Sequence, residues 1–272
     1  AIARAMFKSW FIDFDPVNDN ALAAGNPIPD ELADRAALRQ QAAEEHAKPL
    51  PDDLRALFPA EFTHTDTMGW IPRGWEVAPL SSIATNPRRT VQPADVAPET
   101  PYIGLEHMPR RSISLDAWGQ AADVASGKSR LNQGEILFGK LRPYFHKVGL
   151  APVSGVCSTD ILVVVPKLDC WHTFVLALVS SKAYVDYTDQ CSAGTKMPRT
   201  NWTDMGRYGV AMPPTSLAET FQQHTAKTLR RIAFAVRQNG RLSALRDTLL
   251  PKLLTGEVTV PVAATLTEEA SR

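Results

Sequence analysis

Cations and aromatic rings follow one short apolar run near the middle of the chain. Ile136, Leu137 and Phe138 come after Gly134 and predict a buried strand. The next residues include Lys140, Arg142, Lys147, Tyr144, Phe145 and His146. Such cations neutralise phosphates, while rings and a guanidinium fork can contact base edges. The pattern favours a nucleic-acid surface, although for this stretch alone a strand that ends in solvated cations is the commoner outcome.

Four stretches of the chain resemble one known family. Residues 134–149 are similar to the segment G-D-I-L-F-x-K-L-R-P-Y-x-x-K of Type I restriction-modification specificity (S) subunits, with Glu135 where Asp is commoner. Residues 157–163, 192–199 and 249–257 match further family segments in the same order. Any one match would be weak, but four in order are specific. The chain therefore resembles a Type I S subunit, with one target-recognition domain as in a half-subunit.

The resemblance implies a fold and a domain order. The fold class is α+β: a mixed, curved or barrel-like β target-recognition domain with short helices, followed by a long coiled-coil-type helix. The expected order is the end of a coiled-coil helix (1–17), a Pro-rich linker with a short helix (18–69), the target-recognition domain (70–214), the distal coiled-coil helix (215–260) and a flexible tail (261–272). Within the linker, residues 30–47 are expected to be helical.

The resemblance also implies partners. A specificity subunit binds double-stranded DNA and scaffolds the modification (methyltransferase) subunits and the restriction subunit. S-adenosylmethionine and ATP are then bound by those partners, and this chain has no cofactor, metal or catalytic residue of its own. With a single recognition domain, the chain would form a homodimer to read both parts of a split target.

Eight residues are the predicted DNA contacts: Lys128, Lys140, Arg142, Tyr144, Lys147, Thr195, Lys196 and Arg199. Arg142 is the strongest candidate, because only arginine takes guanine or phosphate bidentately. The lysines suit phosphates. The alternative for Arg142 is an ion pair with a domain carboxylate such as Asp160. The loop of residues 192–199 lacks the order of a nucleotide-binding loop, so it is either a phosphate grip or a plain surface turn.

A long amphipathic helix closes the chain. Ser216 and Glu219 predict a capping box at its start, and Pro251 predicts its end. The helix would run about 35 residues, or roughly 50 Å. Apolar residues at spacings of three and four predict a seam for a partner helix, with one polar member. The interface residues are Leu229, Ile232, Val236, Asn239 and Leu242.

Composition limits the classes of protein that remain. The 272 residues carry a formal net charge of +0, which disfavours a free-standing, non-specific DNA binder. Three cysteines without a C-x-x-C pair, and no membrane-length apolar run, favour a reduced cytoplasmic protein. Two alternatives stay open: a methyltransferase or nuclease with an unrecognised site, and a coiled-coil adaptor that binds no DNA.

Overall fold

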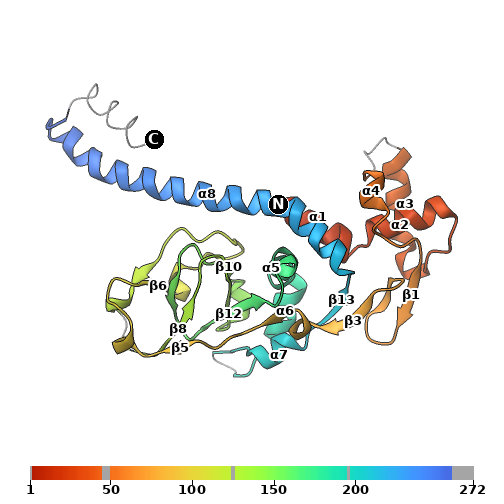
Figure 1. Ribbon diagram of the computed structural model, residues 1–272, viewed down its shortest axis with the longest axis horizontal. Coiled ribbons are helices and arrows are strands. Elements are labelled where there is room, and N and C mark those ends of the chain that lie inside the picture. The colour runs from red at the N-terminus through yellow and green to blue at the C-terminus, as the bar shows by residue number, and fades with distance from the viewer. Residues whose placement is uncertain (1, 45–49, 124–125, 195–196, 259–272) are drawn as a thin grey trace.

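The computed structural model describes residues 2–44, 50–123, 126–194 and 197–258. A head of two β-sheets and several helices lies beneath one long helix, and a smaller helical arm projects from one end (Figure 1). The α+β prediction is confirmed. Within the described ranges the sheets stay open and form no closed barrel, so the barrel-like alternative is wrong.

The head is built on two sheets. One is antiparallel, in the order β10-β9-β12-β4: Val148–Leu150, Ile136–Gly139, Ile161–Pro166 and Ala84–Thr85. The other has the order β5-β8-β11-β6-β7: Thr90–Val91, Lys128–Leu131, Gly155–Cys157, Pro101–Ile103 and Gly119–Gln120. Of the pairings in this second sheet, that of β11 with β6 is parallel.

The side chains of β9 and β12 point alternately to the two faces of their sheet, and this alternation defines the layers of the head. Leu137 and Val163 belong to a buried cluster that also contains Ile103 and Cys157 from the second sheet. Their neighbours Phe138 and Val164 belong instead to the main core, together with the helices. Because successive side chains of a strand face opposite sides, the antiparallel sheet lies between the second sheet and the helical layer. Both of its faces are covered, which explains why β9 is buried throughout.

Four helices complete the head: α1 (Ile2–Phe11), α5 (His172–Val179), α6 (Lys182–Gln190) and α7 (Trp202–Gly206). Short 3-10 turns connect the strands and helices, η1 (Leu80–Ser82), η2 (Pro93–Asp95), η3 (Leu105–His107), η4 (Ala121–Asp123), η5 (Pro143–Phe145) and η6 (Asp169–Trp171). Helices α5 and α6 are separate elements, because Ser181 caps the start of α6 by accepting a hydrogen bond from the Tyr184 amide.

The long helix α8 spans Thr215–Leu254, or 40 residues. The capping-box prediction is wrong, since Pro214 is the N-cap and the Ser216 carbonyl accepts from Thr220 inside the helix. The end at Pro251 is also wrong. A proline removes only its own amide hydrogen bond, and the Thr255 amide still donates to the Pro251 carbonyl at 3.0 Å.

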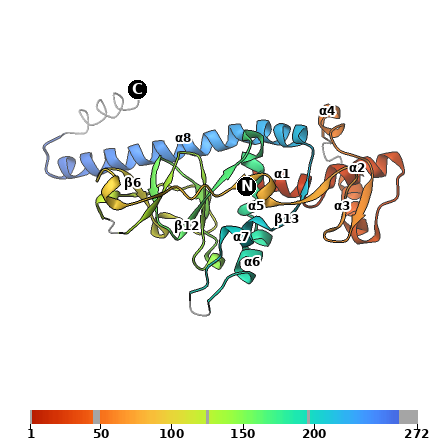
Figure 2. The same ribbon diagram turned by 60° about the horizontal axis from the view of Figure 1, so that its bottom comes forward.

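Aromatic rings fix the first turns of α8 to the head. Phe221 is fully buried, and its ring centroid lies 5.1 Å from that of Phe11 and 5.9 Å from that of Trp10. Phe174 of α5 lies 5.0 Å from Phe11 in the same cluster. Beyond Thr225 no residue of α8 is buried in the described range. The rest of the helix extends over the head and past it (Figures 1 and 2).

The segment expected to be a Pro-rich linker is a folded arm. It contains α2 (Asp15–Ala24), α3 (Asp30–Glu44), α4 (Asp52–Arg55) and the hairpin of β1 (Phe62–Thr65) with β2 (Gly69–Pro72). Arg35 donates to Asp15 at 2.6 Å and ties α3 to α2. The arm returns through β3 (Glu76–Pro79), which pairs with β13 (Gly209–Met212) directly before α8. Residues 45–47 of the predicted helix lie outside the described residues.

Candidate nucleic-acid interface

The turn between β9 and β10 carries most of the predicted DNA contacts. The Gly139 amide donates to the Lys147 carbonyl at 2.8 Å and closes the base of the turn. Between them, η5 is flanked by two residues in the left-handed region, Arg142 (φ 51°) and His146 (φ 52°). Non-glycine residues adopt this conformation only where the surroundings hold them there. The turn is thus held in one shape by its neighbours.

The loop of residues 192–200 lies against this turn, although more than fifty residues separate the two in the sequence. The Arg142 amide donates to the Pro198 carbonyl at 2.8 Å, and the Thr200 amide donates to the Lys140 carbonyl at 3.1 Å. The described flanks of residues 195–196 lie on the side of the head farthest from α8 (Figure 2). The structure therefore joins two segments that the sequence could only suggest separately.

A third segment, residues 108–114, completes the surface. The Arg111 amide donates to the His146 carbonyl at 2.9 Å. The Arg110 guanidinium lies over the Phe145 ring, 4.0 Å from its centroid, in a cation–π contact. In the sequence these two arginines are adjacent and lie more than thirty residues before Phe145. No local pattern could reveal their contact with residues of a distant turn.

We call the described residues of the segments 108–114, 139–147 and 192–200 together the cationic surface. These described residues include six Lys or Arg residues and no Asp or Glu: Arg110, Arg111, Lys140, Arg142, Lys147 and Arg199. The whole chain, in contrast, is balanced at +0. Asp160 borders the surface and pairs with Arg199 at 3.4 Å, and Glu106 lies near Lys147. Such an excess attracts polyanions.

Arg142 lies directly before η5 and makes no ion pair with a carboxylate among the described residues. The carboxylate expected as its alternative partner, Asp160, pairs instead with Arg199. The Arg142 guanidinium lies 5.9 Å from the Phe145 ring centroid. Its Nε atom is buried and has no hydrogen-bond partner among the described residues. An unsatisfied buried donor of this kind is costly to the folded state.

Lys147 and His146 are more enclosed than Arg142. The Lys147 ammonium donates to the Leu105 carbonyl, and burial followed by the nearby Arg110 charge lowers its pKa. The His146 Nε2 atom lies 2.9 Å from the Ser180 carbonyl, and burial lowers the pKa of the ring. Lys147 therefore contributes charge to the surface while its head group is partly committed to the protein.

The structure contradicts the prediction of Lys128 as a phosphate contact. Its side chain is only 6% exposed, and its Nζ atom donates to the carbonyl and hydroxyl of Ser126 at 2.7 and 2.8 Å. The ammonium also lies 5.7 Å from the Tyr102 ring centroid. These local partners satisfy the charge. The predicted contacts Thr195 and Lys196 lie outside the described residues.

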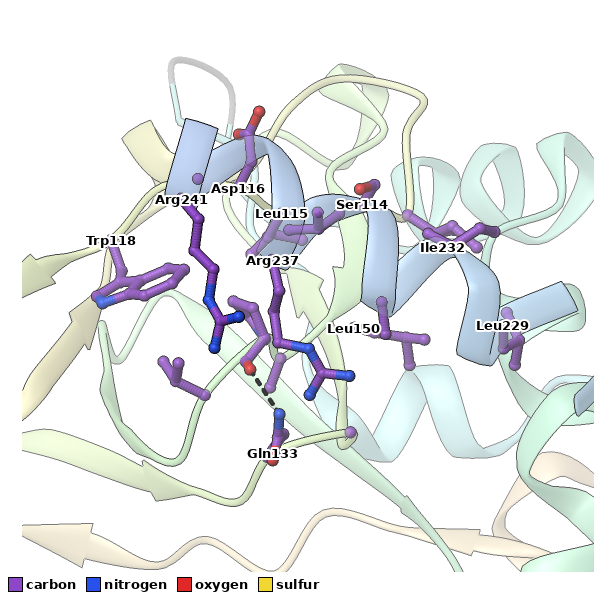
Figure 3. Close-up of a pocket in the computed structure, with 18 of the residues that line it drawn as sticks. Ser114, Leu115, Asp116, Trp118, Gln133, Leu150, Leu229, Ile232, Arg237 and Arg241 are labelled. Carbon is purple, nitrogen blue, oxygen red and sulfur yellow. Dashed lines mark hydrogen bonds between the residues drawn. The ribbon is translucent and has the colours of Figure 1, made fainter. Parts of the chain in front are cut away.

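The predicted helix interface divides into two parts. Leu229, Ile232 and Val236 are half-buried and line a groove of about 680 Å³ between α8 and the head. Arg237 and Arg241 point from α8 into this groove (Figure 3). Across the groove, Gln133 donates to the Pro152 carbonyl at 2.9 Å. The other two interface residues, Asn239 and Leu242, face solvent.

A second excess of positive charge lies on α8. Residues 220–246 include six Lys or Arg residues and no Asp or Glu: Lys227, Arg230, Arg231, Arg237, Arg241 and Arg246. They lie on the part of the helix that extends beyond its buried first turns. The hydrophobic spacing had directed attention to the apolar seam, so this charge pattern was missed, although counting charges along the helix would have found it.

Other site chemistries find little support in the described parts of the chain. No group of three or more His, Cys, Asp or Glu residues there could hold a metal ion. All three cysteines are free, and burial raises the pKa of Cys157 to about 12. Among the helices of these ranges, none has both the length and the apolar character needed to cross a bilayer.

Sequence comparison finds relatives of one kind, although no family model matches the chain. The specificity subunit of the Type I restriction enzyme HindI from Haemophilus influenzae is 24% identical over 94% of this chain and 61% of its own length. The EcoDI specificity subunit of Escherichia coli is 25% identical over 75% of this chain and 48% of its own. The MjaIX specificity subunit of Methanocaldococcus jannaschii is 21% identical over 95% and 52%.

Comparison with solved structures finds partial similarity to two of them. One comes from a study of complex assembly and conformational transition of the type I R-M system, with a TM-score of 0.49. The other is the HsdS subunit from Thermoanaerobacter tengcongensis, with a TM-score of 0.48. Each is 18% identical and matches 68% of this chain but 49% of the solved one. The chain thus spans about half to three-fifths of the length of its curated relatives. It is a homologue of the specificity subunits of Type I restriction enzymes.

Proposed function

We propose that this chain recognises one part of a split DNA target as a specificity subunit of a Type I restriction-modification complex. The observation that carries the proposal is the cationic surface. Backbone hydrogen bonds join its three segments, and their described residues hold six cations and no carboxylate in a chain of zero net charge. A local excess of positive charge suits the phosphate backbone of duplex DNA. Such binding does not require the whole protein to be basic.

Within this surface the roles divide by how free each head group is. Arg142 is half-buried, and its guanidinium fork suits a base edge or a bidentate phosphate. Lys140 is half-buried beside it and suits a phosphate. Arg199 already pairs with Asp160 at 3.4 Å, so a phosphate must compete with that carboxylate. We therefore rank Arg142 above Lys140, and Lys140 above Arg199, as contributors to affinity.

The long helix supplies the second half of the proposal, which is assembly. Most of α8 beyond Thr225 is exposed and carries apolar side chains next to six cations, so it suits a protein partner with apolar and acidic groups. The partners are the modification and restriction subunits, which would bind S-adenosylmethionine and ATP. This chain would be cytoplasmic, contribute recognition rather than catalysis, and require a second recognition domain, in a longer chain or in a second copy, to read both target halves.

DNA binding by the chain, alone and assembled with its partner subunits, tests this function. Charge reversal of Lys140→Glu with Arg142→Glu should abolish specific binding, measured by fluorescence anisotropy against duplex fragments selected from a random pool. The plot of log affinity against log salt should also become shallower, by about one unit of slope for each phosphate that the variant no longer neutralises.

A matched control keeps the same change in net charge. Lys8→Glu with Arg73→Glu reverses two exposed cations outside the cationic surface. This pair should leave DNA affinity near that of the unmodified chain. Equally weakened binding in both double variants would show that only net charge matters, and would remove the surface from the proposal.

A further inference from the structure

We propose that Tyr144 and Met197 form a wedge that enters the DNA base stack and separates two neighbouring base pairs. This inference rests on the proposed function and specifies how the cationic surface contacts the duplex. It concerns two large apolar side chains that this surface leaves exposed. Tyr144 is 50% exposed and Met197 is 48% exposed.

The two side chains come from backbones that are joined to each other. Met197 precedes Pro198, whose carbonyl accepts from the Arg142 amide at 2.8 Å. Tyr144 follows Arg142 by two residues, inside η5. This hydrogen bond and that between the Thr200 amide and the Lys140 carbonyl bring together two segments that each present an apolar group to solvent. These two exposed side chains do not pack in the core, and they lie on the surface whose positive charge suits DNA.

The turn that carries Tyr144 is held rigidly. The Phe145 amide donates to the Arg142 carbonyl at 2.9 Å, and the His146 amide donates to the Pro143 carbonyl at 2.8 Å. Pro143 is buried, and its ring fixes φ. The Tyr144 ring stands edge-on to Phe145, with 4.8 Å between centroids and 69° between planes. A ring on so fixed a base loses little conformational freedom when it is inserted.

The chemistry around the two side chains favours DNA over an apolar protein partner. Arg110 lies over Phe145, and Arg142 lies on the same ring at 5.9 Å. Cations beside an apolar tip would leave buried, unpaired charge in a protein interface. On a duplex the same cations meet phosphates on either side of the opened step. Proteins that kink DNA use this combination of flanking cations and an inserted apolar side chain.

The test is a fluorescence scan of the bound duplex. Duplexes are first selected with the full chain from a random pool of about 40 base pairs, which is longer than one recognition surface covers. 2-Aminopurine then replaces adenine at successive positions of the selected duplex. We expect the unmodified chain to raise fluorescence at one step only, because 2-aminopurine brightens when it is unstacked. Tyr144→Ala with Met197→Ala should abolish that rise and weaken specific binding about tenfold, in keeping with the removal of one stacking interaction.

Conservative variants separate the wedge from a merely structural role. Tyr144→Phe and Met197→Leu keep the apolar volume and should keep the bright step. Circular dichroism and thermal unfolding of the double alanine variant should match the unmodified chain. A bright step that survives in the double alanine variant overturns the wedge, as does a tightly bound duplex without any unstacked step. If no duplex is selected at all, the proposed function itself fails, which is a distinguishable result.

Discussion

The cationic surface and the α8 helix both concentrate positive charge, yet they hold it in opposite ways. On the cationic surface, backbone hydrogen bonds among three distant segments fix the chain, including the left-handed residues Arg111, Arg142 and His146. On α8, six cations lie on a single regular helix whose outer turns contact little of the head. The cationic surface therefore fixes the positions of its cations in three dimensions, whereas α8 fixes only the spacing of its cations along the helix axis.

This difference suggests different partners for the two regions. Reading base edges requires side chains held at definite positions, because a base pair is distinguished by donors and acceptors a few ångströms apart. A helix that docks another protein needs a long apolar and charged face, and it can tolerate small shifts along the contact.

The largest effect is expected where the first turns of α8 pack on the head. Phe221→Ala removes a fully buried ring that contacts Phe11 and Trp10. We expect it to lower the free energy of unfolding by about 3–5 kcal/mol, as for other buried aromatic truncations. Chemical denaturation measures this change. Phe234→Ala, at a position that is 55% exposed, is the control and should change stability little. Equal effects would mean that α8 is not fixed at its base.

Assembly should depend on the groove-lining face of α8. Ile232→Asp with Val236→Asp places two carboxylates on half-buried positions of that face. We expect the double variant to lose its protein partners while it still binds duplex DNA, because the cationic surface is untouched. Light scattering of the co-expressed complex gives the mass. Retention of the full mass would contradict the role of this face.

Arg142 should be the most sensitive single residue for DNA. Arg142→Ala is expected to cost about 1–3 kcal/mol of specific binding and to relax preference at one base pair. Arg142→Lys keeps the charge but loses the fork, so it should restore non-specific binding only. Selection from a random duplex pool reports both quantities. If lysine restores full specificity, Arg142 contacts a phosphate and not a base.

The smallest effect concerns pH. Burial lowers the pKa of His146 below its usual 6.5, so the folded turn favours the neutral ring. The unfolded chain binds the proton more readily, and stability is therefore lost as pH falls below about 6.5 towards the lowered value. His146→Gln should flatten this dependence in thermal unfolding measured between about pH 7 and pH 5. An unchanged slope would show that the ring does not contribute to it.

Local patterns predicted much of the fold. The apolar run became β9, the closing pattern of apolar residues became α8, and residues 30–44 became α3. These elements depend on neighbours within a few positions, which sequence periodicity reports directly. The charge and rings of residues 139–147 were likewise visible from their composition. Four matched segments were enough to identify the family.

Contacts between distant segments could not be predicted in this way. Lys128 was predicted to contact DNA, but the fold buries it against Ser126. The contact of Arg110 with the Phe145 ring appears only in the fold. The Pro-rich segment was predicted to hold a short helix, but its pairing of Arg35 with Asp15 arises only once two helices have packed together. Each of these outcomes depends on which strands and helices become neighbours.

The sequence by itself determined the elements and the chemical types: a buried strand, a basic aromatic turn, and a long helix with an apolar stripe. The tertiary structure alone decided which cations share a surface and which are neutralised. The physical reason is that hydrogen bonding and hydrophobic periodicity act between near neighbours, whereas charge and burial depend on every group that folding brings within a few ångströms.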